Sequence, residues 1–139
     1  MIIVCDIGPL VASVNRRDRH HGISVRLFTT GEDTLLVPAT VAVEVDCLLR
    51  SRVGDRAARA FLRDVDEGRY LLAPITADVF RRAVELDERH ADVGLGLVDA
   101  SVVAVAEAHR AGAIATLDHA HLRLAASAEV ALLPDSSEL

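Results

Sequence analysis

Short apolar runs alternate along the chain with segments of helical periodicity. The runs are rich in β-branched residues and end at a polar residue, a glycine or a proline, which is typical of buried strands. They occupy residues 2–5, 34–37, 70–73, 113–117 and 130–133. Fully apolar strands that are separated by helices indicate a parallel sheet covered on both faces. The sequence therefore predicts an α/β fold with three layers and a mainly parallel central sheet of about four to five short strands.

Helical segments fill the intervals between these strands. In residues 41–52, apolar side chains recur at Val41, Val45, Leu48 and Leu49, which form one face of a helix, and Thr40 is the expected N-cap. The other expected helices cover residues 10–14, 18–28, 57–65, 76–88 and 98–111, with 119–126 as a loop or short helix. No linker or repeat interrupts the pattern, so we expect one domain over residues 1–139, ending in the polar tail 135–139.

Composition and charge narrow the classes of function. Of 139 residues, 51% are apolar and 26% are charged, so the chain can bury a sizeable core. A net charge of −6 argues against nucleic-acid binding through a basic surface. That objection weakens if several acids gather in one pocket that holds divalent cations. All 15 basic residues are arginine, which excludes mechanisms that need a lysine.

The two cysteines and the N-terminus indicate a cytoplasmic protein. Cys5 and Cys47 lie in apolar stretches and are predicted to be buried free thiols. The N-terminus has no basic region before its apolar residues and reaches an acid at Asp6, unlike a signal peptide. No apolar run reaches the roughly 18 residues that a membrane span needs.

Four acids occupy positions at which this fold would bring them together. Asp6 follows the run 2–5, and Asp118 follows the run 113–117. Asp99 lies in the first turn of the helix 98–111, just after a glycine-containing loop, and Glu44 lies on the apolar face of the helix 41–52. In open α/β sheets, ligands bind beyond the carboxyl ends of the strands. These positions predict a shared acidic pocket at that edge.

A divalent cation would resolve the electrostatic cost of such a pocket. Acids that share a site raise one another's pKa, and a buried unpaired carboxylate is costly. Mg²⁺ and Mn²⁺ prefer oxygen ligands, and such sites suit phosphodiester hydrolysis. Taken singly, each acid also has a plain structural alternative. Asp6 could open a turn, Asp99 and Asp118 could cap helices, and Glu44 could pair with a buried arginine.

Four segments resemble the sequence motifs of PIN domains. Residues 5–10, Cys-Asp-Ile-Gly-Pro-Leu, resemble the opening of the family, a strand followed by Asp-Thr/Ser-x-x-Leu. Residues 38–45 resemble the second motif, with a glutamate inside a helix, and residues 95–101 resemble the third, Asp-Ala at a helix start. Residues 114–118 resemble the fourth, Thr-x-Asp after a strand. The order and spacing fit along the whole chain, and the size is similar to that of VapC-type toxins.

The resemblance implies a function and a site. It would make Asp6, Glu44, Asp99 and Asp118 the catalytic, metal-binding acids of a Mg²⁺- or Mn²⁺-dependent endoribonuclease. Such a protein would be the toxin of a bacterial toxin–antitoxin pair, a homodimer that cleaves single-stranded or structured RNA and is inhibited by a small cognate antitoxin. The alternatives that remain open are an RNA-processing PIN nuclease without an antitoxin and a non-catalytic PIN scaffold.

Some positions depart from the family pattern or lie outside it. Ile7 stands where a hydroxyl residue is usual, and His119-Ala120-His121-Leu122 stands where relatives often have a basic residue and an aromatic. We expect His119 and His121 to lie in a solvated loop, and the alternative is that they contact phosphate. The arginines of segment 15–19, with Arg50 and Arg52, are candidates for RNA contact, and the alternative is a solvated charge cluster.

Three other enzyme classes with acids at strand ends do not fit. A phosphoryl-accepting receiver domain uses a lysine, which this chain lacks. A haloacid-dehalogenase-type phosphatase needs Asp-x-Asp after its first strand, and Gly8 occupies the second acidic position. A dinucleotide-binding domain needs a glycine-rich turn there, and one glycine before Pro9 is too few.

Overall fold

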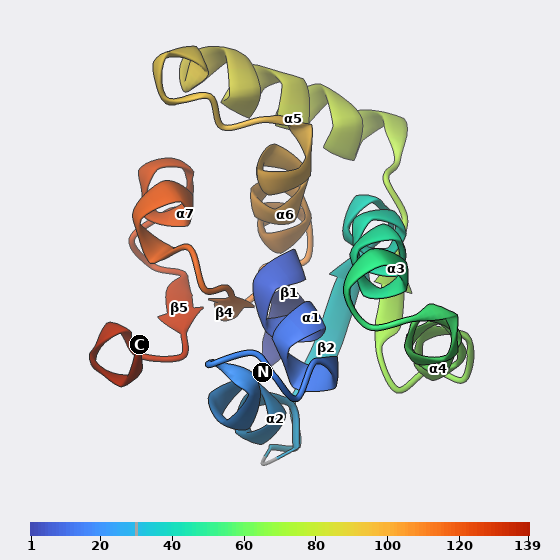
Figure 1. Cartoon of the computed structure of the whole chain (residues 1–139). Coiled ribbons are helices and arrows are strands. Elements are labelled where there is room, and N and C mark those ends of the chain that lie inside the picture. The colour runs from blue at the N-terminus through green and yellow to red at the C-terminus, as the bar shows by residue number, and fades with distance from the viewer. Residues whose placement is uncertain (30) are drawn as a thin grey trace.

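A five-stranded, all-parallel sheet forms the centre of the computed structural model, which describes residues 1–29 and 31–139. The strands lie in the order β3-β2-β1-β4-β5 (Figure 1). Their bounds are β1 Ile2–Cys5, β2 Thr34–Pro38, β3 Leu71–Ala73, β4 Ala113–Ala115 and β5 Ala131–Leu133. The prediction of an α/β fold with a mainly parallel sheet is confirmed.

Helices connect every pair of consecutive strands. They are α1 Ile7–Val14, α2 His21–Thr29, α3 Ala39–Arg52, α4 Asp55–Asp66, α5 Ala77–Arg89, α6 Leu97–Ala108 and α7 His119–Ala125, with 3-10 turns at Ala91–Val93 and Ser136–Glu138. The chain winds outward from β1 through β2 to β3 and then returns to β4 on the other side of β1. The direction of winding therefore reverses between β1 and β4, and the crevice at such a switch point is where open parallel sheets bind ligands.

The sheet separates a large core from a small one. Val4, Leu36 and Ile114 pair across β1, β2 and β4 and belong to the large core. Neighbouring residues such as Ile3 and Ala113 point to the other face, because side chains alternate along a strand, and pack against α2. Figure 1 shows α2 and α6 on opposite sides of the sheet. The predicted three layers are confirmed.

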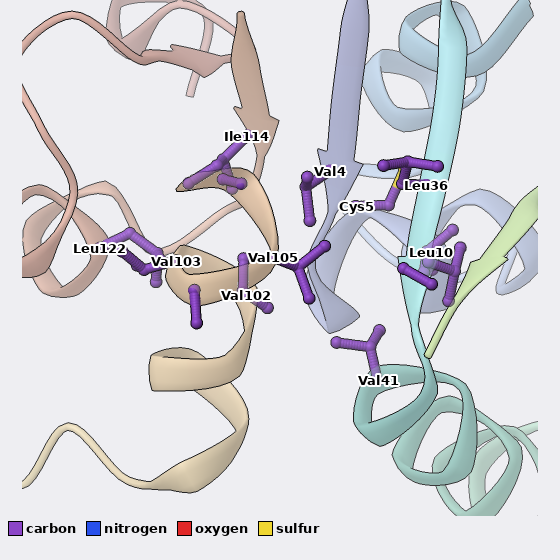
Figure 2. Close-up of a cluster of buried hydrophobic side chains, with 14 of the residues drawn as sticks. Val4, Cys5, Leu10, Leu36, Val41, Val102, Val103, Val105, Ile114 and Leu122 are labelled. Atoms are coloured by element: carbon purple, nitrogen blue, oxygen red, sulfur yellow. The ribbon is translucent and has the colours of Figure 1, made fainter. Parts of the chain in front are cut away.

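Helix α6 fills the large core. Every residue from Ala100 to Ala106 is buried, as expected for a helix that is apolar on most sides. In Figure 2, Val105 lies toward β1 whereas Val103 lies toward Leu122 of α7. Because α6 is enclosed, its first turn at the crevice, which includes Asp99, is held firmly in place.

Several helices begin earlier than the sequence pattern predicts, α1 and α3 among them. Helix α1 begins at Ile7 rather than at residue 10 and includes Pro9, which a helix tolerates in its first turn because no intrahelical hydrogen bond is lost there. Helix α3 begins at Ala39, directly after Pro38, so the prediction that Thr40 is the N-cap is wrong. The Thr40 hydroxyl instead lies 2.6 Å from the Ser101 hydroxyl of α6.

The fourth strand is shorter than predicted. It ends at Ala115, so Asp118 does not follow it directly but lies at the N-cap of α7, where its Oδ1 accepts the backbone N–H of His121 at 3.2 Å. Beyond β4, the Thr116 backbone N–H still donates to the Leu133 carbonyl oxygen at 2.9 Å. The buried Thr116 side chain bonds Asp6 and the backbone N–H of Asp118.

The two cysteines differ in exposure. Cys5 is fully buried as predicted, but Cys47 is exposed, so that part of the prediction is wrong. Cys47 lies two residues from the buried Val45, and a shift of two residues moves a side chain to the opposite side of a helix. Within the described residues, no helix is both long and apolar enough to cross a bilayer.

Candidate active site

Asp6 directly follows β1, at the switch point of the sheet where β1 and β4 lie side by side. Its backbone N–H donates to the Ala115 carbonyl oxygen at 2.8 Å, which keeps it beside the end of β4. The side chain is only 6% exposed. Its Oδ2 accepts the Thr116 hydroxyl at 2.8 Å, whereas its buried Oδ1 has no hydrogen-bond partner among the described residues. A buried carboxylate oxygen without a partner is unfavourable, so this atom indicates a missing cationic or donor group.

Thr116 connects two of the four predicted acids. Its Oγ1 donates to Asp6 and also accepts the backbone N–H of Asp118 at 3.0 Å. The residue is fully buried, so neither bond competes with water. A single hydroxyl therefore fixes the Asp6 carboxylate relative to the backbone that carries Asp118.

The side chains of Asp99 and Asp118 both approach His121, a residue that the sequence pattern places in a solvated loop. His121 Nδ1 lies 3.1 Å from Asp99 Oδ2 and 3.4 Å from Asp118 Oδ2. One ligand atom from each of the three residues lies within 4.8 Å of the others, a cluster that could hold a metal ion. His121 and His119 belong to α7 and are partly buried, so the expectation of a solvated loop is wrong for both.

Glu44 lies on α3, outside the cluster of Asp99, Asp118 and His121. It is partly buried, and no hydrogen bond or ion pair joins its side chain to any described residue. The alternative of a buried arginine partner finds no support, because Arg50 of the same helix is bound to Asp46 at 3.0 Å. The charge of Glu44 acts on Asp6, whose pKa it raises. Since Thr40 bonds Ser101, α3 is tied to the helix that carries Asp99.

The electrostatics of the crevice favour added positive charge. Burial raises the pKa of Asp6, and the charges of Asp118 and Glu44 raise it further, whereas the nearby backbone N–H of Ile7 and the Thr116 hydroxyl lower it. Burial, followed by the charges of Asp6 and Asp118, raises the pKa of Asp99 to about 6, although His121 opposes the change. Among the described residues, no arginine forms an ion pair with any of the four acids. Protons or a cation must therefore balance them.

The structure thus brings two of the four predicted acids, Asp99 and Asp118, into one cluster. Asp6 and Glu44 lie outside that cluster, but the charge of Asp6 acts on Asp99 and that of Glu44 acts on Asp6. The structure also adds two residues, Thr116 and His121. Thr116 belongs to the Thr-x-Asp motif, but its part in holding Asp6 depends on a contact across 110 residues of sequence. His121 lies three residues after Asp118 in the first turn of a helix, a spacing that places two side chains on one face. That spacing was the only signal in the sequence that could have identified the histidine.

The arginine candidates divide into two groups. Arg50 is occupied by Asp46 and by Asp55 at 3.6 Å. Arg16, Arg17 and Arg52 are exposed, have no ion pair with any described residue, and line one surface hollow of about 440 Å³. Arg19, the remaining candidate, is also exposed but does not line this hollow. The hollow lies where α1 and α3 end, whereas both helices begin at the edge of the sheet that carries the acids.

Comparison with known proteins agrees with this geometry. The PIN domain family matches residues 3–127. Ribonuclease VapC26 of Mycobacterium tuberculosis is 29% identical over 119 residues, which are 86% of this chain and 88% of that protein. The crystal structure of M. tuberculosis VapC20, described as a toxin that cleaves the sarcin–ricin loop, is 25% identical with a TM-score of 0.82 and covers 90% of this chain and 96% of its own.

A more distant structure has the same fold. VapBC2 from Rickettsia felis aligns with a TM-score of 0.69 at 16% identity, over 95% of this chain and 97% of its own. The resemblance noted in the four sequence motifs is thereby confirmed, and the chain belongs to the PIN-domain family.

Proposed function

We propose that this chain is a metal-dependent endoribonuclease and the toxin of a toxin–antitoxin pair. Asp6, Glu44, Asp99 and Asp118 are its catalytic, metal-binding acids, and Mg²⁺ or Mn²⁺ is its cofactor. The relatives support this reaction, because one is named a ribonuclease and another a toxin that cleaves the sarcin–ricin loop.

One observation carries the proposal. Asp6 is 6% exposed and has a carboxylate oxygen with no partner among the described residues, in a crevice with three other acids. A residue with a purely structural role, such as a turn or a cap, would have its oxygens bonded by neighbouring groups. The donor set of carboxylate oxygens fits a hard divalent cation.

The roles of the chain's own residues follow from their contacts. Thr116 holds one oxygen of Asp6, which leaves Oδ1 available, and the N-terminus of α7 holds one oxygen of Asp118, which leaves Oδ2 available. Asp99 presents its Oδ2 from the enclosed helix α6. A bound divalent cation would supply positive charge to the scissile phosphate and would activate the attacking water. Glu44 adds negative charge from the α3 side.

The test is RNA cleavage at increasing Mn²⁺ concentration with the purified full chain. Two substrates are needed, a mixed-sequence single-stranded RNA and a hairpin RNA with a structured loop. Asp6→Asn and Asp99→Asn should abolish cleavage, whereas the exposed Asp66→Asn should not. Cleavage that survives in Asp6→Asn would contradict this site. Absence of cleavage together with absence of Mn²⁺ binding in calorimetry would leave the scaffold alternative in first place.

The antitoxin needs a separate test, because an RNA-processing nuclease would share the chemistry. We propose a small protein antitoxin and a homodimer, as the resemblance of the four sequence motifs implies. Expression of the wild-type chain in bacteria should arrest growth, and Asp6→Asn should relieve the arrest. Normal growth with an enzyme that is active in vitro would favour RNA processing without an antitoxin. Light scattering of the purified protein measures the oligomeric state.

A further inference from the structure

His121 approaches the acids with a ring nitrogen. The backbone N–H of His121 donates to Asp118 Oδ1 at 3.2 Å, and its side chain folds back over the same acid. Its Nδ1 then lies 3.1 Å from Asp99 Oδ2 and 3.4 Å from Asp118 Oδ2. The nitrogen therefore lies beside the two carboxylate oxygens, Asp99 Oδ2 and Asp118 Oδ2, that are available to bind a metal ion.

The second ring nitrogen determines where the hydrogen of the neutral ring is. His121 Nε2 lies 3.2 Å from the Val93 carbonyl oxygen in the turn Ala91–Val93. A carbonyl oxygen can only accept a hydrogen bond, so Nε2 donates. In the neutral ring, Nδ1 then presents its lone pair to Asp99 and Asp118. With the ring neutral, three electron-rich atoms face one another, and either a proton on Nδ1 or a shared metal ion would balance them.

This arrangement is the usual one for a metal-binding histidine. The nitrogen that does not bind the metal normally donates its N–H to a carbonyl or a carboxylate, which fixes the ring and its tautomer. Val93 supplies that carbonyl here. The unpartnered Oδ1 of Asp6, buried in the same crevice, is an independent indication that a cation belongs there.

We propose that His121 is a direct metal ligand through Nδ1, together with Asp99 and Asp118, and that it shifts the site away from Mg²⁺ toward first-row transition ions. The inference rests on the proposed function only in that a divalent cation occupies the crevice. Mg²⁺ strongly prefers oxygen ligands, whereas transition ions bind imidazole well and Co²⁺ binds more tightly than Mn²⁺. One nitrogen among carboxylates therefore changes the choice of metal without changing the fold.

The first experiment is calorimetry with Co²⁺ and Mg²⁺ on the wild-type chain and on His121→Asn. An asparagine offers an oxygen that Mg²⁺ accepts in place of a nitrogen. The ratio of Co²⁺ affinity to Mg²⁺ affinity should fall about tenfold or more in His121→Asn. It should be unchanged in His109→Asn, which removes an exposed histidine at the end of α6. An unchanged ratio in a folded His121→Asn protein would overturn the inference.

The second experiment detects the bond itself. Pulsed electron paramagnetic resonance of bound Mn²⁺ should show coupling to one histidine nitrogen in the wild type and in His109→Asn, and none in His121→Asn. Mn²⁺ bound to the wild type without nitrogen coupling would overturn the role of His121 and leave the proposed nuclease site intact. A wild-type chain that binds none of these ions would overturn both.

Discussion

The Thr116 hydroxyl donates to Asp6 Oδ2 at 2.8 Å and joins the ends of β1 and β4, which lie 110 residues apart in the sequence. Thr116 Oγ1 also accepts the backbone N–H of Asp118. The crevice is therefore shaped by one buried side chain that is not itself a candidate for catalysis. Substitutions of Thr116 therefore test how the acids are positioned without changing the charge of the site.

Thr116→Val keeps the shape of the side chain and removes both hydrogen bonds. We expect the unfolding free energy to fall by about 1–3 kcal/mol, because buried polar groups lose their partners. We also expect cleavage at saturating Mn²⁺ to fall by about tenfold or more, since Asp6 loses its orientation. Urea denaturation and single-turnover cleavage measure the two effects. Thr116→Ser should restore most of the rate, and an equally slow serine variant would argue against the hydrogen bond as the cause.

The raised pKa of Asp99 makes stability depend on pH. Burial and neighbouring acids raise this pKa from 3.8 to about 6, so the folded protein retains the proton to higher pH than the unfolded chain. Without metal, the unfolding free energy should therefore fall as pH rises from about 4 through about 6, by up to about 3 kcal/mol. Urea denaturation in a chelator across this pH range measures the loss.

Asp99→Asn removes the ionising group and should reduce the loss. Asp6 has a pKa that is raised by the same causes, so some pH dependence should remain. The metal-free variant should be more stable than the wild type at pH 7, because it carries one fewer repelling charge. Asp66→Asn, at an exposed position, should follow the wild type. A pH profile of Asp99→Asn identical to that of the wild type would contradict the assignment.

Arg17 and Arg52 are expected to bind RNA phosphates away from the acids. Helix α1 has 8 residues and separates the acidic edge from the hollow. On α3, Arg52 lies eight residues beyond Glu44. At a rise of about 1.5 Å per residue, each of these spacings is about 12 Å. In an inactive Asp6→Asn background, Arg17→Gln with Arg52→Gln should weaken RNA binding and reduce its logarithmic salt dependence by about 1.5 units. Fluorescence anisotropy between about 50 and 200 mM salt measures this. Arg56→Gln with Arg63→Gln removes the same charge from α4 and is the control. An equal loss of RNA affinity in the two double variants would indicate a general charge effect.

The hydroxyl pair Thr40 and Ser101 joins the helices that carry Glu44 and Asp99. Ser101 Oγ lies 2.6 Å from Thr40 Oγ1 and donates to the Val98 carbonyl oxygen at 2.7 Å. Ser101→Ala should lower the unfolding free energy by about 0.5–1.5 kcal/mol, because the partly buried Thr40 hydroxyl loses its partner. It should also weaken Mn²⁺ binding, which calorimetry measures. Ser51→Ala removes an exposed hydroxyl of α3 and should change neither; a Ser101→Ala chain with wild-type affinity would show that the pair is structural only.

The sequence by itself determined the layers of the fold and indicated four candidate acids. Strand-length apolar runs such as residues 2–5 have few alternatives to a buried strand, and the apolar helix 98–111 could only be a core helix, because both patterns are local. The four motifs then located Asp6, Glu44, Asp99 and Asp118 by type and spacing. Local patterns were weaker at boundaries, and they missed the early starts of α1 and α3.

Only the tertiary structure decided how the acids are held and what joins them. The bond between Thr116 and Asp6, the bond between Thr40 and Ser101, and the position of His121 between Asp99 and Asp118 each depend on the packing of separate elements. The register of β1 against β4 and the angle of α7 against α6 set those distances. No local pattern encodes them, because they result from the burial of the whole core.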